Sequence, residues 1–132
     1  MPQFQKLTPN LLVANVERSL AFYAGTLGFE RGMTVPDASP FVFAAVTSGA
    51  IEIFLNDAAT AVKEYPAFGG KPLGATATMF IEVEGVDAVH DRLKPHVKMV
   101  MEIVTQWYGM REFAIEDPDG YVITFAERVP QG

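Results

Sequence analysis

The amino-acid sequence predicts an α+β fold built from two βαβββ modules. Two segments carry apolar residues at helical spacing, and the other apolar segments are short and separated by turn residues. Short motifs also recur in the two halves of the chain. Residues 13–17 (VANVE) match residues 83–87 (VEGVD), and residues 51–53 (IEI) match residues 123–125 (ITF). Such a repeat indicates duplication of one supersecondary unit.

The first module begins with a strand that is expected over residues 6–14. Asn15 follows as an N-cap residue, because its side chain can accept hydrogen bonds from the free amides of a first helical turn. The helix is expected over residues 16–27, and Gly28 ends it in a left-handed conformation. Three further strands complete the module, over residues 30–34, 41–47 and 50–55.

A connector rich in Ala, Gly and Pro follows, with one helical turn expected over residues 58–63. The second module then repeats the pattern, and the segment 117–120 (DPDG) predicts a tight turn before its last strand. Its strands are expected over residues 76–83, 97–105, 111–115 and 121–126, and its helix over residues 86–93. We expect one domain over residues 1–132, with module one at 5–57, the connector at 58–74 and module two at 75–128.

The composition limits the possible functions. The chain has no cysteine, so disulfides and thiol chemistry are excluded. Its net charge of −6 disfavours nucleic acid as a partner, and it either attracts a cationic small ligand or only aids solubility. Neither a signal peptide nor a membrane-spanning apolar stretch is visible, so we expect a cytoplasmic protein without a membrane partner.

Strand alternation divides four of the expected strands into two faces. One face is apolar and is expected to pack beneath the helices. The other is mixed, and it carries Thr8, Asn10, Leu12, Glu52, Phe54, Thr78, Phe80, Glu82, Val122, Thr124 and Ala126. Since each module has one helix for four strands, the mixed face is either solvated or lines a cleft with a few convergent polar groups. The internal duplication favours the cleft.

Two long segments resemble one protein family. Residues 11–30 (LLVANVERSLAFYAGTLGFE) and 107–125 (WYGMREFAIEDPDGYVITF) are similar to the opening and closing segments of the vicinal oxygen chelate superfamily. This family includes glyoxalase I, extradiol dioxygenases and bleomycin-resistance proteins. The resemblance covers essentially the whole chain. It implies that the two βαβββ modules form a partly open mixed-sheet barrel and that the protein is a homodimer.

The resemblance also implies four metal-ligand positions, which the enzymes of the family fill with His, Glu or Gln. These positions fall on Thr8, Glu52, Thr78 and Thr124. Only Glu52 is a competent ligand, because neutral hydroxyl groups bind divalent metals poorly. We therefore expect no metal and no other cofactor, and we assign no catalytic residue.

The metal-free bleomycin-resistance branch is the part of the family that the sequence resembles most, and its proteins sequester a bulky cationic aromatic drug. Trp107 and Tyr108 precede a strand, and Trp107 either stacks on such a ligand or covers the barrel end or the dimer contact. Phe54 and Phe80 either form walls of the cleft or are ordinary packing residues.

The polar residues that are candidates for the cavity also have more than one possible role. Glu52 is expected to face the cavity, whereas Glu82 is expected at the surface because it lies near the end of its strand. Arg111 is expected to pair with Glu52 or a neighbouring acid, or else to contact the ligand. Asn10 and Thr124 complete the expected cavity set.

Four aromatic residues outside the mixed face have weaker functional signals. Tyr65 and Phe68 lie in the connector, where they either anchor the loop or form a flap over the cleft. His90 and His96 are both expected on the solvated surface.

The residues and the resemblance together predict a cofactor-free protein that binds a small organic molecule in a cleft at a homodimer interface. Two alternatives remain open. One is an enzyme of the same fold, a lyase, isomerase or dioxygenase, that uses a metal at a degenerate site or no metal at all. The other is a structural dimer whose cavity is filled by its own side chains.

Overall fold

A computed structural model describes residues 3–74 and 76–130. The chain divides into two compact units: unit one ends at Lys71, and unit two begins at Pro72. This division falls within the expected connector. Ala75, the expected first residue of module two, lies outside the described residues, as do residues 1–2 and 131–132 of the expected domain.

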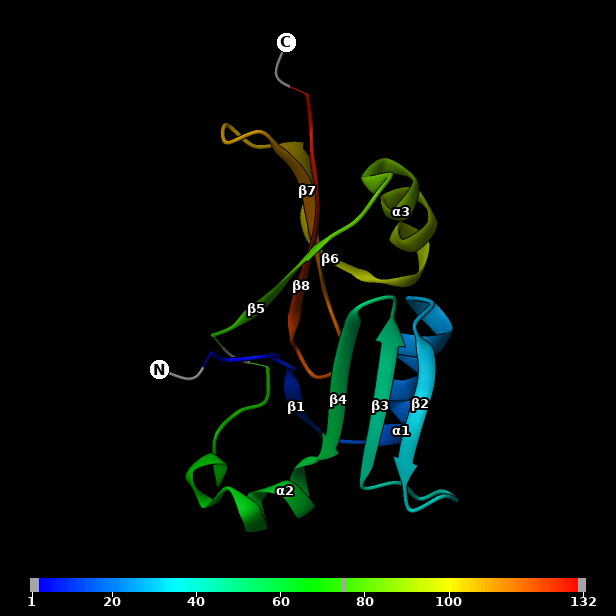
Figure 1. The fold of residues 1–132 in the computed structure, drawn as a ribbon, viewed down its shortest axis with the longest axis vertical. Helices are drawn as coiled ribbons and strands as arrows, with labels where there is room; N and C mark the ends of the chain where they lie inside the picture. The colour runs from blue at the N-terminus through cyan, green and yellow to red at the C-terminus, as the bar shows by residue number, and fades with distance from the viewer. Residues whose placement is uncertain (1–2, 75, 131–132) are drawn as a thin grey trace. The chain divides into compact units, whose positions relative to one another are not determined.

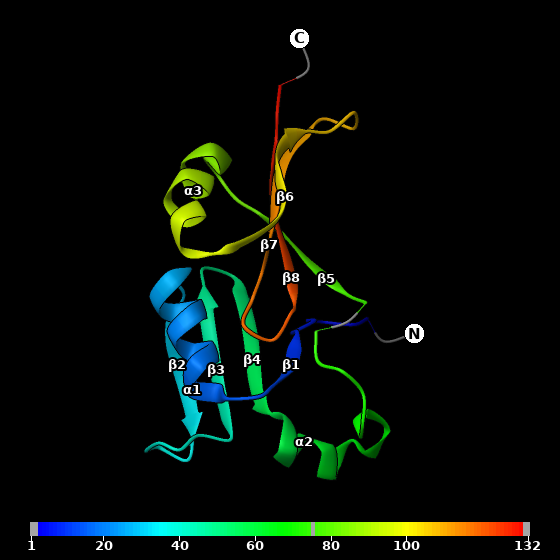
Figure 2. The same cartoon turned by 180° about the vertical axis from the view of Figure 1, so that it is seen from behind.

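Unit one is a mixed four-stranded sheet with helical segments. Its elements are β1 (Asn10–Val13), α1 (Val16–Leu20), η1 (Ala21–Thr26), β2 (Glu30–Val35), β3 (Phe43–Ser48), β4 (Ile51–Asp57), α2 (Ala58–Glu64) and η2 (Pro66–Phe68). The strand order is β1-β4-β3-β2, with β1 parallel to β4 and the other neighbours antiparallel. Helix α1 lies against one face of the sheet, behind β2 and β3 in Figure 1 and in front of them in Figure 2.

Unit two has the same topology. Its elements are β5 (Thr78–Glu82), α3 (Val86–Leu93), η3 (Lys94–His96), β6 (Lys98–Thr105), β7 (Met110–Glu116) and β8 (Val122–Arg128). The strand order is β5-β8-β7-β6, with β5 parallel to β8. The predicted α+β class with two βαβββ modules is therefore confirmed, and both sheets are mixed and open. Among the described residues, no helix is long and apolar enough to span a membrane.

The helix predicted over residues 16–27 begins as expected and then widens. Asn15 Oδ1 accepts a hydrogen bond from the Arg18 amide at 2.8 Å, which confirms the predicted N-cap. The α-helical part ends at Leu20. It continues as the π-helix η1, and the Leu27 amide donates to the Phe22 carbonyl at 2.9 Å. Because a π-turn holds one more residue than an α-turn, the wider spacing shifts the register of the face that packs on the sheet.

Helix α3 packs on β7 and β8. Its N-cap residue, Gly85, has no side chain to offer, and Glu127 of β8 accepts from the amides of Gly85 and Val86 at 2.8 and 3.0 Å instead. The predicted surface position of His90 is wrong, because its side chain is buried. His90 follows Val86 by four residues and precedes Leu93 by three, so all three side chains lie on the helix face that packs on the sheet.

The predicted division of the strands into two faces is confirmed in each unit. The fully buried strand residues on the helix side are Val13, Ala44, Val46, Ile53, Leu55, Phe113, Ile115 and Ile123. Residues of opposite parity are mostly half-buried or exposed. The exceptions are residues that lie on the mixed face and are nevertheless buried, namely Leu12, Ala45, Met110, Glu112, Ala114 and Ala126.

The connector contains more helix than the sequence predicted. Helix α2 runs from Ala58 to Glu64, and Asp57 caps it by accepting from the Thr60 amide at 3.1 Å. Tyr65 and Phe68 are both exposed, and their ring centroids lie 5.9 Å apart. Their role as a flap stays a prediction.

Candidate functional site

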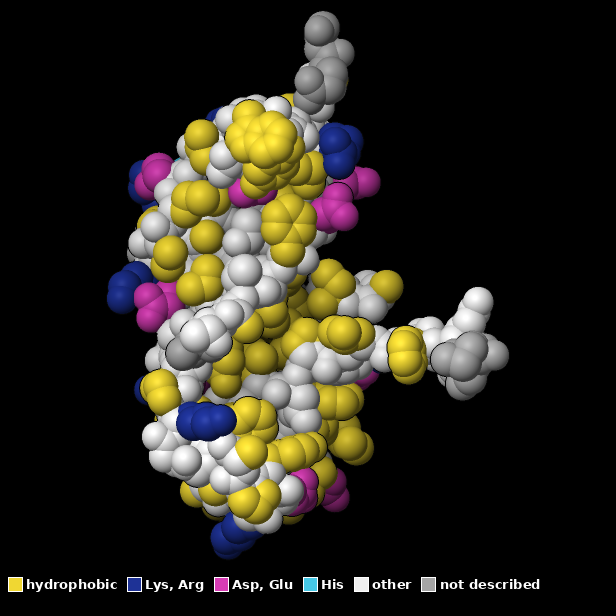
Figure 3. Space-filling model, turned by 90° about the vertical axis from the view of Figure 1, so that its left-hand side faces the viewer, with side chains coloured by type: hydrophobic (Ala, Val, Ile, Leu, Met, Phe, Trp, Pro, Cys, Tyr) yellow, Lys and Arg dark blue, Asp and Glu magenta, His cyan; other side chains and the backbone are white. Residues whose placement is uncertain are grey.

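The turn between β6 and β7 carries an exposed aromatic pair. Trp107 and Tyr108 occupy this turn, as predicted, and their rings meet edge to face with centroids 5.3 Å apart. The Trp107 side chain is 92% exposed and Tyr108 is 43% exposed. Figure 3 shows exposed apolar side chains on this side of unit two, with most charged side chains at the margins. The indole is therefore open to contact with a ligand.

Beneath this turn lies Glu112, a carboxylate that the sequence analysis missed. Its side chain is 4% exposed. The Tyr108 hydroxyl donates to Glu112 Oε1 at 2.6 Å, and the Gln106 side-chain amide donates to the same oxygen at 3.4 Å. Glu112 Oε2 is buried and has no hydrogen-bond partner among the described residues. Strand alternation in the sequence could have placed Glu112 on the mixed face, opposite to Phe113, but it does not predict the burial of Glu112.

The hydrogen bond to Glu112 also fixes the position of the Tyr108 hydroxyl group and affects its pKa. This hydrogen bond raises the pKa of Tyr108, and desolvation and the charge of Glu112 raise it further. Tyr108 therefore keeps its proton at neutral pH and remains a hydrogen-bond donor. Through Tyr108 and Gln106, the turn is thus attached to Glu112 on the mixed face of β7.

The strand register places other predicted residues on the same face of unit two. Phe80 pairs with Thr124, and in the next row Glu82 and Glu112 both pair with Ala126. Phe80 is 53% exposed, and Glu82 is exposed as expected. An aromatic ring, a hydroxyl and carboxylates therefore share this face with the small side chain of Ala126.

The mixed face of unit one has its own polar and aromatic contacts. Asn10 pairs with Phe54 in the register of β1 and β4, and the Asn56 amide group donates to Asn10 Oδ1. The rings of Phe43 and Phe54 pack with centroids 5.1 Å apart. Both aromatic side chains are half-buried.

The four positions that correspond to metal ligands in the family do not fit a divalent metal. Thr78 and Thr124 offer neutral hydroxyl groups, whose oxygens lie 3.4 Å apart, and Thr8 offers another. The Glu52 carboxylate is held by the ammonium group of Lys6 at 2.6 Å. Among residues 3–74 and 76–130, no three His, Asp or Glu side chains gather where they could hold a metal ion.

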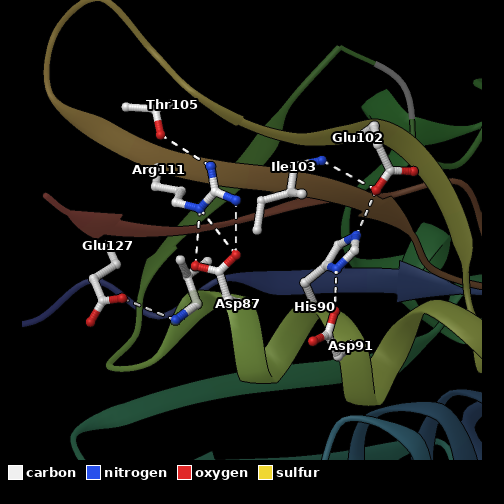
Figure 4. Close-up of polar contacts among 9 residues, drawn as sticks. Asp87, His90, Asp91, Glu102, Ile103, Thr105, Arg111 and Glu127 are labelled. Carbon is white, nitrogen blue, oxygen red and sulfur yellow. Dashed lines mark hydrogen bonds and ion pairs between the residues drawn. The ribbon is translucent and has the colours of Figure 1, made fainter.

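Arg111 turns away from the mixed face. Its guanidinium nitrogens donate to both carboxylate oxygens of Asp87 on α3, at 2.9 to 3.1 Å, and to the Thr105 hydroxyl at 3.1 Å (Figure 4). Of the alternatives for Arg111, the geometry supports the ion pair with a neighbouring acid, and that acid is Asp87 rather than Glu52. The pair lowers the pKa of Asp87 and raises that of Arg111.

A shallow pocket in unit one lies beside α1 and η1, on the helix side of the sheet rather than on the mixed face. Glu17 lines it and accepts hydrogen bonds from the Ser39 hydroxyl and the Phe41 amide. The guanidinium carbon of Arg31 lies 4.9 Å from the centre of the Phe41 ring. These contacts tie the loop before β3 to α1.

Two βαβββ units of the same topology define a class of duplicated α+β proteins. The chain belongs to the family described as the Glyoxalase/Bleomycin resistance protein/Dioxygenase superfamily, whose profile matches residues 5–125. The resemblance seen in the sequence is therefore confirmed.

Individual relatives indicate the part of this superfamily that the chain is similar to. A bleomycin resistance protein from Geobacillus stearothermophilus is 28% identical over 137 residues, which cover 92% of this chain and 95% of that protein. The crystal structure of a bleomycin-binding protein from bleomycin-producing Streptomyces verticillus, complexed with copper(II)-bleomycin, is 26% identical. It matches with a TM-score of 0.65 over 95% of this chain and 97% of that one. A superfamily member from Nocardioides gives a TM-score of 0.80 at 19% identity, over 100% of this chain and 88% of that one, which shows likeness of fold.

Proposed function

We propose that this protein binds and sequesters a small, flat organic ligand of cationic character, and that Trp107 is its stacking surface. The observation that carries the proposal is the 92% exposure of the Trp107 side chain in a turn that is tied to the mixed face of β7. Flat aromatic and cationic groups gain attraction from the face of an indole ring. An indole left this exposed gains little from its own fold.

The relatives support the same proposal. The curated proteins that match are bleomycin resistance proteins, and a solved relative was crystallised with copper(II)-bleomycin. The donor set at the family's metal positions supports binding rather than metal-assisted chemistry, because three of the four residues are threonines.

The other members of the proposed site lie on the mixed faces of the two units. We propose that Phe54 and Phe80 supply apolar walls and that Asn10, Glu52, Tyr108 and Thr124 supply polar contacts, in a cleft at a homodimer interface. For Arg111 we propose the ion pair with Asp87 as its main role.

Tryptophan fluorescence tests the proposal directly, because Trp107 is the single tryptophan of the sequence. We expect bleomycin, or copper(II)-bleomycin, to change the emission of Trp107 saturably. In calorimetric titrations, Trp107→Ala weakens binding about tenfold or more, and Trp107→Phe weakens it less, since a stacking ring remains.

Phe4→Ala is the matched control, because it removes a fully exposed ring of unit one to which no ligand contact is assigned. We expect it to bind like the wild type. Equal affinity of Trp107→Ala and wild type, or no saturable signal with either probe, contradicts the proposal. Near-stoichiometric metal in the purified protein, lost in Glu52→Ala, instead favours an enzyme of the same fold.

A further inference from the structure

We propose that Glu112 is the anchor for a protonated amine of the ligand, held beside the Trp107 stacking surface. This inference rests on the proposed function and names the chemical group that the site selects. Three features of the structure carry it. Among the described residues, one oxygen of a buried carboxylate has no hydrogen-bond donor, the carboxylate is bonded to the aromatic turn, and the neighbouring Lys and Arg side chains do not neutralise it.

The first feature is the incomplete hydrogen bonding of Glu112. One carboxylate oxygen accepts from Tyr108 and Gln106, whereas the other, also buried, has no partner among the described residues. A buried carboxylate oxygen without a donor is costly, and native proteins leave few such atoms. A cationic donor from a ligand relieves this cost, since hydrogen bonds between ionised groups are roughly twice as strong as neutral ones.

The second feature is the short path from the carboxylate to the indole. Tyr108 contacts Trp107 through its ring and Glu112 through its hydroxyl, so one side chain joins the aromatic surface to the acid. A ligand that stacks on Trp107 and carries an amine on a short arm can therefore meet both groups. The net charge of −6 also favours the approach of a cation.

The third feature is that the nearby Lys and Arg side chains that the structure describes either pair with other carboxylates or form no ion pair with Glu112. Lys98 pairs with Glu116 at 3.0 Å, and Arg111 pairs with Asp87 on the helix side. Arg128 shares the face of Glu112 by register, and no ion pair joins the two within the described part of the chain. A cation from the ligand therefore meets no competing side chain that already neutralises Glu112.

A matched pair of fragments tests the proposal: naphthylmethylamine, which is protonated at neutral pH, and naphthylmethanol, which is neutral and of nearly the same shape. We expect calorimetric titration of the wild type to show about tenfold or greater preference for the amine. Glu112→Gln keeps an oxygen that accepts from Tyr108 but removes the charge, and it should bind both fragments equally. Because the wild-type comparison needs no variant, the test holds even if Glu112→Gln does not fold.

Glu116→Gln is the matched control. It removes the same charge four residues along β7, on the same face, from a carboxylate that has its own Lys98 partner. It should keep the preference for the amine. A wild type without preference, or a Glu112→Gln variant that retains it, overturns the proposal.

Bleomycin separates failure of this inference from failure of the proposed function. If bleomycin changes Trp107 emission but its affinities for Glu112→Gln and for the wild type agree within about twofold, the amine anchor is wrong. The proposed sequestration then still stands. A loss of about tenfold or more in bleomycin affinity in Glu112→Gln, but not in Glu116→Gln, supports the anchor. If neither bleomycin nor the fragments bind the wild type, the proposed function fails, and the anchor fails with it.

Discussion

Arg111 and Glu112 are adjacent in the chain and have opposite surroundings. Arg111 reaches Asp87 on the helix side of the unit-two sheet, and Glu112 is buried on the mixed face beneath Tyr108. The alternation of side chains along β7 separates them. At this position strand parity is a better guide to role than residue type, because both residues are charged.

His90 is a second residue whose surroundings matter more than its type. Its two ring nitrogens lie 2.6 Å from a Glu102 oxygen and 3.0 Å from an Asp91 oxygen (Figure 4). Its ring also meets the ring of Phe113 edge to face. The hydrogen bonds to Asp91 and Glu102 raise the pKa of His90 above its ordinary value of 6.5. The hydrogen bond between His90 and Glu102 lowers the pKa of Glu102.

We predict that stability falls as pH rises above about 6.5 because of His90. Its pKa is higher in the folded state than in the unfolded state, so its contribution is complete below the unfolded pKa. It is lost as pH rises through the folded pKa. Urea unfolding of the wild type from pH 5.5 to 8.5 should show this decline, and His90→Gln should lack that part of it.

His96 provides the control, because it is exposed on η3. The pH dependence of His96→Gln should follow that of the wild type. Identical pH profiles for His90→Gln and wild type contradict the assignment of this decline to His90. The charge of His90 also acts on Asp87, which lies on the same helix, α3. The pH profile of stability for Asp87→Asn therefore separates the contribution of Asp87 from that of His90.

At the scale of elements, the β7–β8 turn depends on a close approach by the segment before β5. A Cβ atom built on Gly74 would lie 2.5 Å from the Asp119 carbonyl oxygen and 2.5 Å from the Gly120 carbonyl carbon. Gly74 also has a φ of +77°. Glycine is therefore required here both for its conformation and for its size.

We predict that Gly74→Ala lowers the free energy of unfolding by about 2–5 kcal/mol, because it adds a backbone clash to the cost of a left-handed alanine. Gly28→Ala is the control, since Gly28 has a φ of +91° and open space around its Cβ position. It should cost about 1–2 kcal/mol, the conformational part alone. Urea denaturation measures both, and equal losses contradict the clash.

At the scale of the molecule, the two units repeat one topology and each covers one sheet face with a helix. The opposite faces keep exposed or half-buried aromatic side chains, among them Phe54 and Phe80. Exposed apolar surface of this kind commonly marks an interface or a binding surface.

We predict that the protein is a homodimer in solution, because pairing covers apolar side chains that a single chain exposes. Light scattering coupled to size-exclusion chromatography should give twice the chain mass. Phe80→Glu, which places a charge on the mixed face of β5, should shift the population towards monomer. Phe68→Glu in η2 is the control and should leave the mass unchanged. A wild type that stays monomeric at high micromolar concentration contradicts the prediction.

The elements were largely predictable because their signals are local. Capping by Asn15, the turn at residues 117–120 and the alternation of apolar residues each act within a few positions of the chain. The π-helical turn η1 and the full length of α2 were not predicted, since propensity alone does not separate them from an α-helix or a single turn.

The candidate site was only partly predictable. Parity placed Thr124, Phe54 and Phe80 on the mixed face, and the turn containing Trp107 lies where the sequence put it. His90 was misplaced, although its spacing from Val86 carried the right signal. Glu112 was overlooked because a charged residue between Arg111 and Phe113 resembles a solvated position until its burial is known.

The sequence by itself therefore determined the duplicated topology, the family and the face on which the residues of four strands lie. Only the tertiary structure decided the partners: Asp87 for Arg111, Lys6 for Glu52, Glu127 for the start of α3, and Tyr108 for Glu112. The physical reason is the range of the interactions. Periodicity and capping act over a few residues, whereas most partners are brought together by strand pairing and helix packing between distant segments. Which donor reaches a given carboxylate depends on distances that no spacing in the chain specifies.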